Sequence, residues 1–225
     1  MRLNERNIKA WYRAASACLA LDKILQALDA CESGLAIDPS HVALQSLQTK
    51  TTKRKEHLSN LEQVRKDRER RAAQEKATLQ LALQVRNITI RRTAQQPHVE
   101  DAKIALADVL DAKSNLSFPA ILLYPLHAQS DLIKAFSEGE TLSQHLEYIL
   151  PLPWDEEDEY TLSNIECYIE TKQGGLIKAG KNLTLLKLLG SGKLEVVDQL
   201  VKINVVPKAK ASIWIEEFKK RQGKQ

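Results

Sequence analysis

The spacing of apolar positions near the amino terminus predicts two antiparallel helices. Apolar or small side chains recur at helical intervals in residues 8–21, and a second run of the same kind covers residues 24–37. Asp22 and Lys23 form a short polar joint between the two runs. The second helix should end at Asp38, because Pro39 disfavours helical geometry in the residue that precedes it.

A long helix is expected from Ser40 to about Gln84. This stretch contains no proline or glycine and is rich in Lys, Arg, Glu, Gln, Leu and Ala, which favour helix. Leu44 and Leu47 place an apolar stripe at its start, where we expect it to cap the preceding helix pair. Residues 66–71 are polar on every side, which predicts a solvated spacer beyond the first turns.

The pattern changes after residue 86 to one that favours an α+β domain, a sheet covered by helices. Residues 87–91 alternate like a half-buried strand, and Gly174 and Gly175 predict the turn of an antiparallel hairpin. Further strands are expected at residues 119–124, 165–170, 176–179 and 201–206. Further helices are expected at residues 99–110, 130–136, 142–149, 183–189 and 211–221.

The first helix pair resembles a tetratricopeptide repeat (TPR). Trp11, Ala15, Ala27 and Pro39 stand at the spacing of that motif, with small residues where the helices cross closely. One hairpin has too little core to stand alone, so the array must continue or be capped. We therefore predict a last TPR hairpin of a truncated array in residues 1–39, a capping and charged linker helix in residues 40–86, and an α+β domain in residues 87–225.

Lys9 and Arg13 are the candidate binding residues. They lie four positions apart on the first predicted helix, hence on one face, where like charges repel by roughly 0.2–0.5 kcal/mol. An anionic ligand would offset that repulsion. The terminal carboxylate of a peptide with acidic side chains suits the forked donors of Arg and the point charge of Lys. The alternative is a pair of solvated surface bases with no ligand.

Composition narrows the class of protein. The 225 residues are 43% hydrophobic and 28% charged, which is typical of a largely folded chain. No stretch approaches the roughly 18 apolar residues of a membrane span, and the amino terminus is polar, so we expect a soluble intracellular protein. Cys18, Cys31 and Cys167 are far apart among apolar residues, which predicts buried, inert thiols.

The distribution of charge along the chain raises an alternative hypothesis for its function. The net charge of +4 combines 33 bases with 29 acids and is too small to indicate nucleic-acid binding. Residues 50–76, however, hold ten Lys or Arg against five acids, without an aromatic residue. A solvated spacer is the favoured interpretation, and an RNA- or ribosome-associated module is the alternative. The acidic run of residues 154–160 is interpreted as a solvated loop, with contact to a basic partner as its alternative.

Catalytic, metal and cofactor sites are not expected. Residues 175–182 resemble a phosphate-binding loop, but Asn182 replaces the Ser or Thr that would reach magnesium, so a structural hairpin is favoured. His127 is interpreted as fixing a turn before a helix by hydrogen bonds, and Ser130 and Asp131 as capping that helix. The five histidines are dispersed and show no metal-ligand spacing.

A family resemblance rests on several longer motifs. Residues 9–13 resemble the last repeat of carboxylate-clamp co-chaperones, and the second domain carries further matches. These are residues 122–125, 127–131, 153–155 and 159–160, and Gly175 to Thr184. Over nearly the whole chain, the protein is similar to the tetratricopeptide repeat protein 4 family of heat shock protein 90 co-chaperones, which includes an essential fungal homologue.

The resemblance implies a helical clamp, a long linker helix and a carboxy-terminal wheel domain, which is a twisted sheet surrounded by helices. It implies that Lys9 and Arg13 hold the Glu-Glu-Val-Asp tail of heat shock protein 90 or 70, as half of a clamp whose other residues lie in two earlier repeats. The wheel domain would engage a client, translation elongation factor 2. The expected protein is a cytoplasmic or also nuclear adaptor, not an enzyme, without membrane attachment or cofactor.

Overall fold

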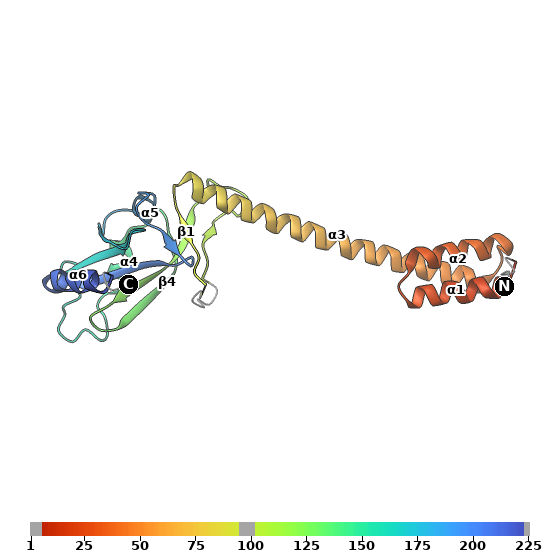
Figure 1. The fold of residues 1–225 in the computed structure, drawn as a ribbon, viewed down its shortest axis with the longest axis horizontal. Coiled ribbons are helices and arrows are strands. Elements are labelled where there is room, and N and C mark those ends of the chain that lie inside the picture. The colour runs from red at the N-terminus through yellow and green to blue at the C-terminus, as the bar shows by residue number, and fades with distance from the viewer. Residues whose placement is uncertain (1–5, 95–101, 223–225) are drawn as a thin grey trace. The chain divides into compact units, whose positions relative to one another are not determined.

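The structure is a computed structural model that describes residues 6–94 and 102–222. The chain divides into two compact units, residues 1–72 and 73–225, and the division falls inside the long helix α3 (Val42–Val85). The order of the elements can be followed in Figure 1. The domain limits expected after residues 39 and 86 stay predictions.

The first unit contains α1 (Ile8–Ala20), α2 (Ile24–Ile37) and the beginning of α3, as the apolar pattern predicted. Ala15, Ala30, Cys31 and Leu44 form a buried cluster in this unit, and Ala27 is also fully buried. Gly34 permits the helices to cross closely, because an added Cβ would lie 2.7 Å from Leu44 Cδ1 and 3.1 Å from Trp11 Cβ. Leu44 is fully buried and Leu47 packs beside it, so the start of α3 packs against the helix pair.

The second unit contains a six-stranded mixed sheet. Its strands are β2 (Ala105–Leu106), β3 (Leu116–Tyr124), β4 (Gln129–Ser137), β5 (Ile165–Glu170), β6 (Leu176–Ala179) and β8 (Val201–Pro207). The order is β2-β3-β8-β5-β6, with β4 also paired to β3. Only β3 and β8 run parallel within this sheet. Separately, β1 (Ile90–Arg91) and β7 (Val196–Val197) form a parallel pair.

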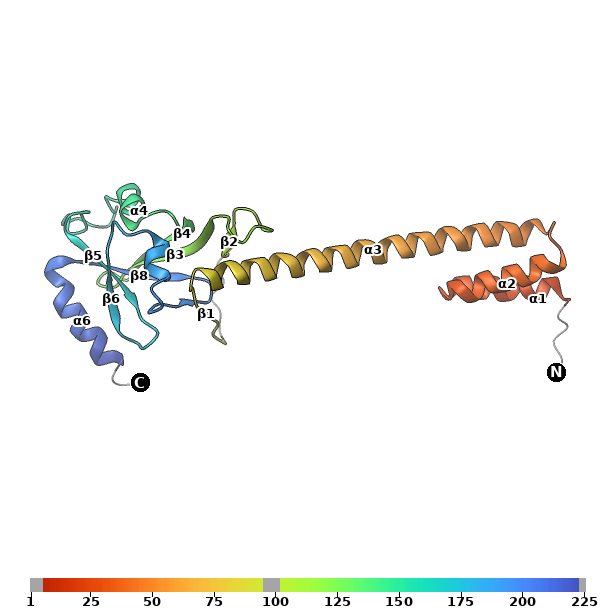
Figure 2. The ribbon, with the colours of Figure 1, turned by 90° about the horizontal axis from the view of Figure 1, so that it is seen from above.

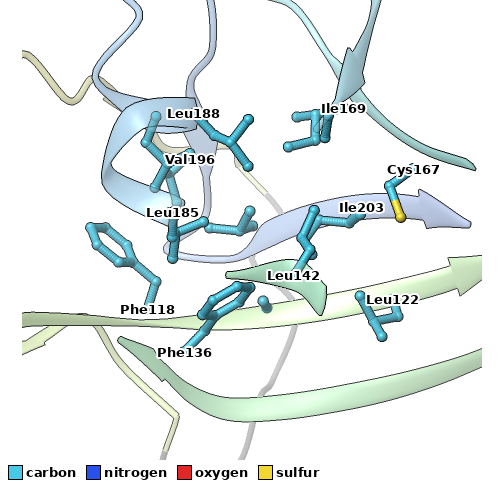
Figure 3. Packing of buried hydrophobic residues seen from close by; sticks show 14 of the residues in the cluster. Phe118, Leu122, Phe136, Leu142, Cys167, Ile169, Leu185, Leu188, Val196 and Ile203 are labelled. Atoms are coloured by element: carbon cyan, nitrogen blue, oxygen red, sulfur yellow. The ribbon is translucent and has the colours of Figure 1, made fainter. Parts of the chain in front are cut away.

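Helices cover both faces of this sheet, which confirms the α+β class. Side chains of α4 (Leu142–Ile149) and α5 (Leu185–Leu189) join the main core with Phe118, Phe136 and Ile203, as Figure 3 shows. On the opposite face α6 (Lys208–Gln222) packs Trp214 against Tyr168 and Val206. Figure 2 shows α6 and α4 on opposite sides of the strands.

Most predicted elements of the second unit are confirmed. β5, β6 and α4 have the predicted bounds, β3 and β8 extend the predicted strands by a few residues, and α5 begins at Leu185, after Thr184. The hydroxyl of Thr184 accepts the backbone N–H of Lys187 and caps the helix. Gly174, with φ +78°, provides the left-handed turn residue between the antiparallel strands β5 and β6.

Two predicted helices are wrong. Residues 130–136 belong to β4, which pairs antiparallel with β3 around a bulge at Phe118 and Ala120. Pairing with the buried strand β3 determines the structure of this segment. The prediction for residues 99–110 falls partly outside the described residues. Its described part forms no helix, and Ala105 pairs with Ser117 in the sheet.

A buried ion pair joins the end of α3 to the sheet. Arg86 follows α3 directly, and its Nε and Nη2 atoms donate to the Glu138 carboxylate at 2.6 and 2.8 Å. The two side chains are only 12% and 8% exposed. The remaining donors of Arg86 reach the carbonyl oxygens of Ala112 and Ser114 at 2.7 and 2.8 Å. Glu138 Oε1 also accepts the N–H of Leu116 at 3.0 Å, so both charges are well satisfied.

Replacing the cation should therefore destabilise the second unit strongly. We expect Arg86→Met to lower the free energy of unfolding by about 3–5 kcal/mol, because Glu138 would be left buried without its partner. Urea denaturation followed by circular dichroism measures this change.

A matched variant, Lys178→Met, removes an ammonium group that lies 2.6 Å from the Glu166 carboxylate. The side chain of Lys178 is 60% exposed. It should lower the free energy of unfolding by about 1 kcal/mol at most. If Arg86→Met lowers it no more than Lys178→Met does, the structural importance assigned to the buried pair is wrong.

Candidate functional site

Lys9 and Arg13 lie one turn apart on the exposed side of α1. α1 begins at Ile8, after the side chain of Asn7 accepts the N–H of Ala10 at 3.2 Å. Within residues 6–94 and 102–222, neither basic side chain forms a hydrogen bond or an ion pair with another residue. The first turn of α1 contains no acidic residue. Cations near the amino end of a helix are disfavoured by its dipole, so this surface would be stabilised by an anion.

The surface beside these bases is partly aromatic. Tyr12 is 39% exposed, and its ring lies 6.5 Å from the ring of His41. His41 itself is held at the start of α3, because its Nδ1 accepts the N–H of Leu44 at 3.2 Å. The contact between the rings of Tyr12 and His41 therefore connects α1, which carries the two basic residues, to the start of α3.

A second exposed strip on α1 consists of small and apolar residues. Ala10, Ala14, Ala17 and Leu21 recur at helical spacing and are all exposed, and Leu21 is 67% exposed. This is the kind of surface that a neighbouring repeat covers in stacked helical hairpins.

The resemblance to a phosphate-binding loop has a structural explanation. Residues 176–179 form strand β6, as the hairpin interpretation predicted. The Lys181 ammonium donates to the backbone carbonyl of Leu162 and, at 3.0 Å, to that of Ile165. Lys181 thus links β5 to the end of the hairpin, and the hypothesis of a phosphate site is not supported.

His127 lies in the turn between β3 and β4, so the prediction that it precedes a helix is wrong. Its ring packs 5.0 Å from the ring of Trp154 and 5.5 Å from that of Tyr160, and its backbone N–H donates to the carbonyl of Tyr124 at 3.1 Å across the turn. Asp131 caps no helix but accepts the hydroxyl of Tyr124 at 2.9 Å. The motifs of residues 122–131 and 153–160 therefore meet in one aromatic cluster.

Burial makes the phenols of this cluster poor acids. Desolvation is the largest cause that raises the pKa of Tyr160, to about 12, and the nearby Glu159 and Asp155 carboxylates add to it. The pKa of Tyr124 is also raised, first by burial and then by its hydrogen bond to Asp131. Both side chains are neutral at physiological pH, which suits a packing role.

The acidic run is partly structural. The Asp155 carboxylate accepts the backbone N–H groups of Glu159 and Tyr160 at 3.1 and 2.7 Å, and Glu159 pairs with Lys210 at 2.6 Å. Only the middle of the run, residues 156–158, is fully exposed. The prediction of a solvated loop therefore holds for these three residues.

The basic stretch of α3 is exposed, but many of its charges are neutralised within the chain. Three ion pairs join neighbouring turns of the helix: Lys66 with Glu62, Arg65 with Glu69 and Arg70 with Asp67. Arg54 binds both carboxylate oxygens of Asp22 at 3.0 and 2.8 Å. This agrees with the solvated spacer and weakens the case for an RNA-binding helix.

Two of the three thiols are inert by burial. Cys31 and Cys167 are buried, and desolvation raises the pKa of Cys167 to about 12. Cys18 is half-buried, so it is more accessible than predicted. No group of three His, Cys, Asp or Glu side chains in residues 6–94 and 102–222 is placed to hold a metal ion. No helix of the described segments has the length and apolarity that a membrane crossing requires.

The fold of the second unit is similar to that of known proteins. Residues 108–218 match the family model of the Cns1/TTC4 Wheel domain. A solved carboxy-terminal domain of the Hsp90 co-chaperone Cns1 from Saccharomyces cerevisiae is 33% identical, with a TM-score of 0.61, over 66% of this chain and 95% of that one. A longer Cns1 structure from the same yeast (delta69) has a TM-score of 0.90 at 28% identity, over 97% of this chain and 73% of that one. The second unit is therefore a Wheel domain.

Full-length relatives extend the match to the whole chain. The Hsp70/Hsp90 co-chaperone cns1 of Schizosaccharomyces pombe is 36% identical, over 99% of this chain and 63% of its own length. Tetratricopeptide repeat protein 4 of Homo sapiens is 29% identical, over 84% of this chain and 53% of its own length. The chain belongs to the Cns1/TTC4 family and spans between half and two thirds of these relatives. The names of the yeast relatives describe co-chaperones, in agreement with the prediction that the chain is not an enzyme.

Proposed function

We propose that the chain acts as a co-chaperone adaptor of heat shock protein 90 and heat shock protein 70. Relatives that match 99% of the chain carry the name Hsp70/Hsp90 co-chaperone, which supports these partners. The adaptor brings a client close to a chaperone and raises its local concentration there, without making or breaking a bond. Its place of action is the cytoplasm, or also the nucleus.

One observation carries the proposed contact with the chaperone. Lys9 and Arg13 are exposed on one side of α1, and neither forms an ion pair with an acidic residue of segments 6–94 and 102–222. A Glu-Glu-Val-Asp tail offers a terminal carboxylate and acidic side chains to these two bases, which would form charge-assisted hydrogen bonds. Tyr12, 39% exposed beside them, provides an apolar surface for the tail's valine.

The Wheel domain is the proposed client-binding part, with translation elongation factor 2 as client. It is a separate compact unit with its own core, so it can engage a client independently of Lys9 and Arg13. The adaptor function needs such a division, because tail and client must be held at the same time.

Titration with a Glu-Glu-Val-Asp peptide tests the chaperone contact. We expect the chain to bind a peptide that ends in this sequence, and Lys9→Ala or Arg13→Ala to weaken binding about tenfold or more. A hydrogen bond to a charged group contributes about 1.5–3 kcal/mol. Isothermal titration calorimetry at low ionic strength measures the affinity.

Two controls test whether binding depends on the terminal carboxylate of the peptide and on these particular bases. The same peptide with an amidated carboxyl end should bind more weakly, and Lys23→Ala, which removes an exposed lysine between α1 and α2, should leave the affinity unchanged. Absence of binding by the unaltered chain would contradict the proposal, and so would unchanged affinity in both Lys9→Ala and Arg13→Ala.

A second experiment tests the client. The full chain should bind purified translation elongation factor 2, and the double variant Lys9→Ala, Arg13→Ala should bind it equally well, because the Wheel domain is unaltered. Sedimentation velocity with both purified proteins measures the complex. No complex with the unaltered chain, or one that the double variant loses, would refute this assignment.

A further inference from the structure

The chain reverses direction where α3 ends. Asn87 has a φ of 55°, a left-handed conformation, and the N–H of Ile88 donates to the carbonyl of Leu83 at 2.9 Å. This turn brings β1 beside the last turns of α3, as Figures 1 and 2 both show. A cleft of about 570 Å³, which we call the α3–β1 cleft, is lined mainly by α3 and residues 88–92. All of its lining residues belong to the second unit.

The α3–β1 cleft is accessible from solvent. Its volume lies within the roughly 300–1,000 Å³ range of ligand pockets. Lys76, Gln80 and Arg92 line it and are exposed. Leu79 and Ile90 are half-buried, so part of each apolar side chain is accessible in the cleft, while the rest packs on the core of the second unit. A ligand can therefore reach polar and apolar side chains without displacing the core.

The charges of the cleft favour an anionic ligand. Among the described residues that line it, Lys76 and Arg92 are the charged ones, and no carboxylate is present. Neither base forms a hydrogen bond or an ion pair within residues 6–94 and 102–222. The side-chain amides of Gln80, Gln84 and Gln199 also have no partner there, and amides can both donate and accept. The cleft therefore combines an uncompensated positive potential with free hydrogen-bonding groups.

Strand β1 also leaves backbone groups unpaired. The carbonyls of Thr89 and Arg91 accept the N–H groups of Val196 and Asp198 at 2.9 and 2.8 Å. Because successive residues of a strand direct their backbone groups to opposite sides, the N–H and carbonyl of Ile90 point away from β7. Neither group has a hydrogen-bond partner in the described part of the chain. A free strand edge of this kind can pair with the main chain of a peptide.

Other anions suit the cleft less well than a peptide does. A nucleic acid would bring many phosphates to only two cations, and its bases would find no aromatic side chain among the described lining residues on which to stack. An inorganic anion would leave Leu79 and the edge of Ile90 unused. An acidic peptide can use the cations, the apolar wall and the strand edge together.

We propose that the α3–β1 cleft binds an acidic segment of a partner protein that also carries apolar side chains. Its carboxylates pair with Lys76 and Arg92 in charge-assisted hydrogen bonds. Its apolar side chains cover the accessible parts of Leu79 and Ile90, and its main chain pairs with the backbone of Ile90. This site is separate from the exposed bases of α1 and needs no terminal carboxylate, so it does not rest on the proposed contact with the chaperone tail.

The probe is a ten-residue peptide, acetylated and amidated at its ends, in which Asp or Glu alternates with Val or Leu. Its capped end lacks the terminal carboxylate that the proposed contact with Lys9 and Arg13 uses. The peptide is titrated at low ionic strength into the isotopically labelled full chain, and the backbone amide resonances are followed by NMR. We expect shifts centred on residues 76–84 and 88–92.

Charge reversals locate the site. Lys76→Glu and Arg92→Glu should each weaken binding at least tenfold, because each replaces an attraction by a repulsion. Lys134→Glu changes the net charge of the chain equally at an exposed lysine of β4 outside the cleft, and should weaken binding less than twofold. The double variant Lys9→Ala, Arg13→Ala should bind the capped peptide as tightly as the unaltered chain. Thermal unfolding checks that each variant is folded.

Several outcomes would overturn the proposal. These are no shifts at millimolar peptide, shifts centred outside residues 76–84 and 88–92, or an effect of Lys134→Glu equal to that of the two cleft variants. Equally tight binding of a peptide with Ser in place of its acids would refute the role of charge. Tighter binding of a ten-nucleotide oligouridine would assign the cleft to nucleic acid instead. If a glutamate variant is unfolded, the alanine variant at that position must weaken binding more than Lys134→Ala, or the proposal fails.

Discussion

The ion pair of Arg86 and Glu138 is the interaction on which the second unit depends. Four segments meet at these two side chains: the end of α3, the loop of residues 112–114, the start of β3 and the turn before α4. The carbonyl of Glu138 also accepts the N–H of Leu186 in α5 at 2.9 Å. A buried pair is tolerated only when nearly all of its donors and acceptors are satisfied, so these segments cannot move independently. Close packing restricts the movement of these segments further, because a Cβ at Gly190 would lie 3.0 Å from the carbonyl oxygen of Arg86.

The helix that this ion pair anchors contributes to two cores. Near its beginning, Leu44 is buried in the helix hairpin with the candidate clamp residues. Near its end, Ala82 and Leu83 are buried in the core of the Wheel domain. The middle of the helix is exposed and stabilised by ion pairs between neighbouring turns. A single continuous helix therefore belongs to both units.

Features set by local chemistry could be predicted from the sequence. Pro39 ends α2, the pair Gly174 and Gly175 makes the β5–β6 turn, and the spacing of Lys9 and Arg13 places them together on an exposed helix side. Features set by distant partners could not. Residues 130–136 are a strand because of their pairing with β3. Arg86 and Glu138 are 52 positions apart, and no local pattern distinguishes this arginine from the many others.

Arg86 makes the last turns of α3 part of the folded Wheel domain, while the middle of the helix is stabilised only locally. Native-state hydrogen exchange of the full chain tests this most directly, because it measures the opening free energy of each amide along one helix. Amides of residues 79–86 should exchange as slowly as those of β3 and β8, and amides of residues 58–70 should exchange much faster. Equal, fast exchange along both stretches would show that Arg86 does not anchor the end of α3.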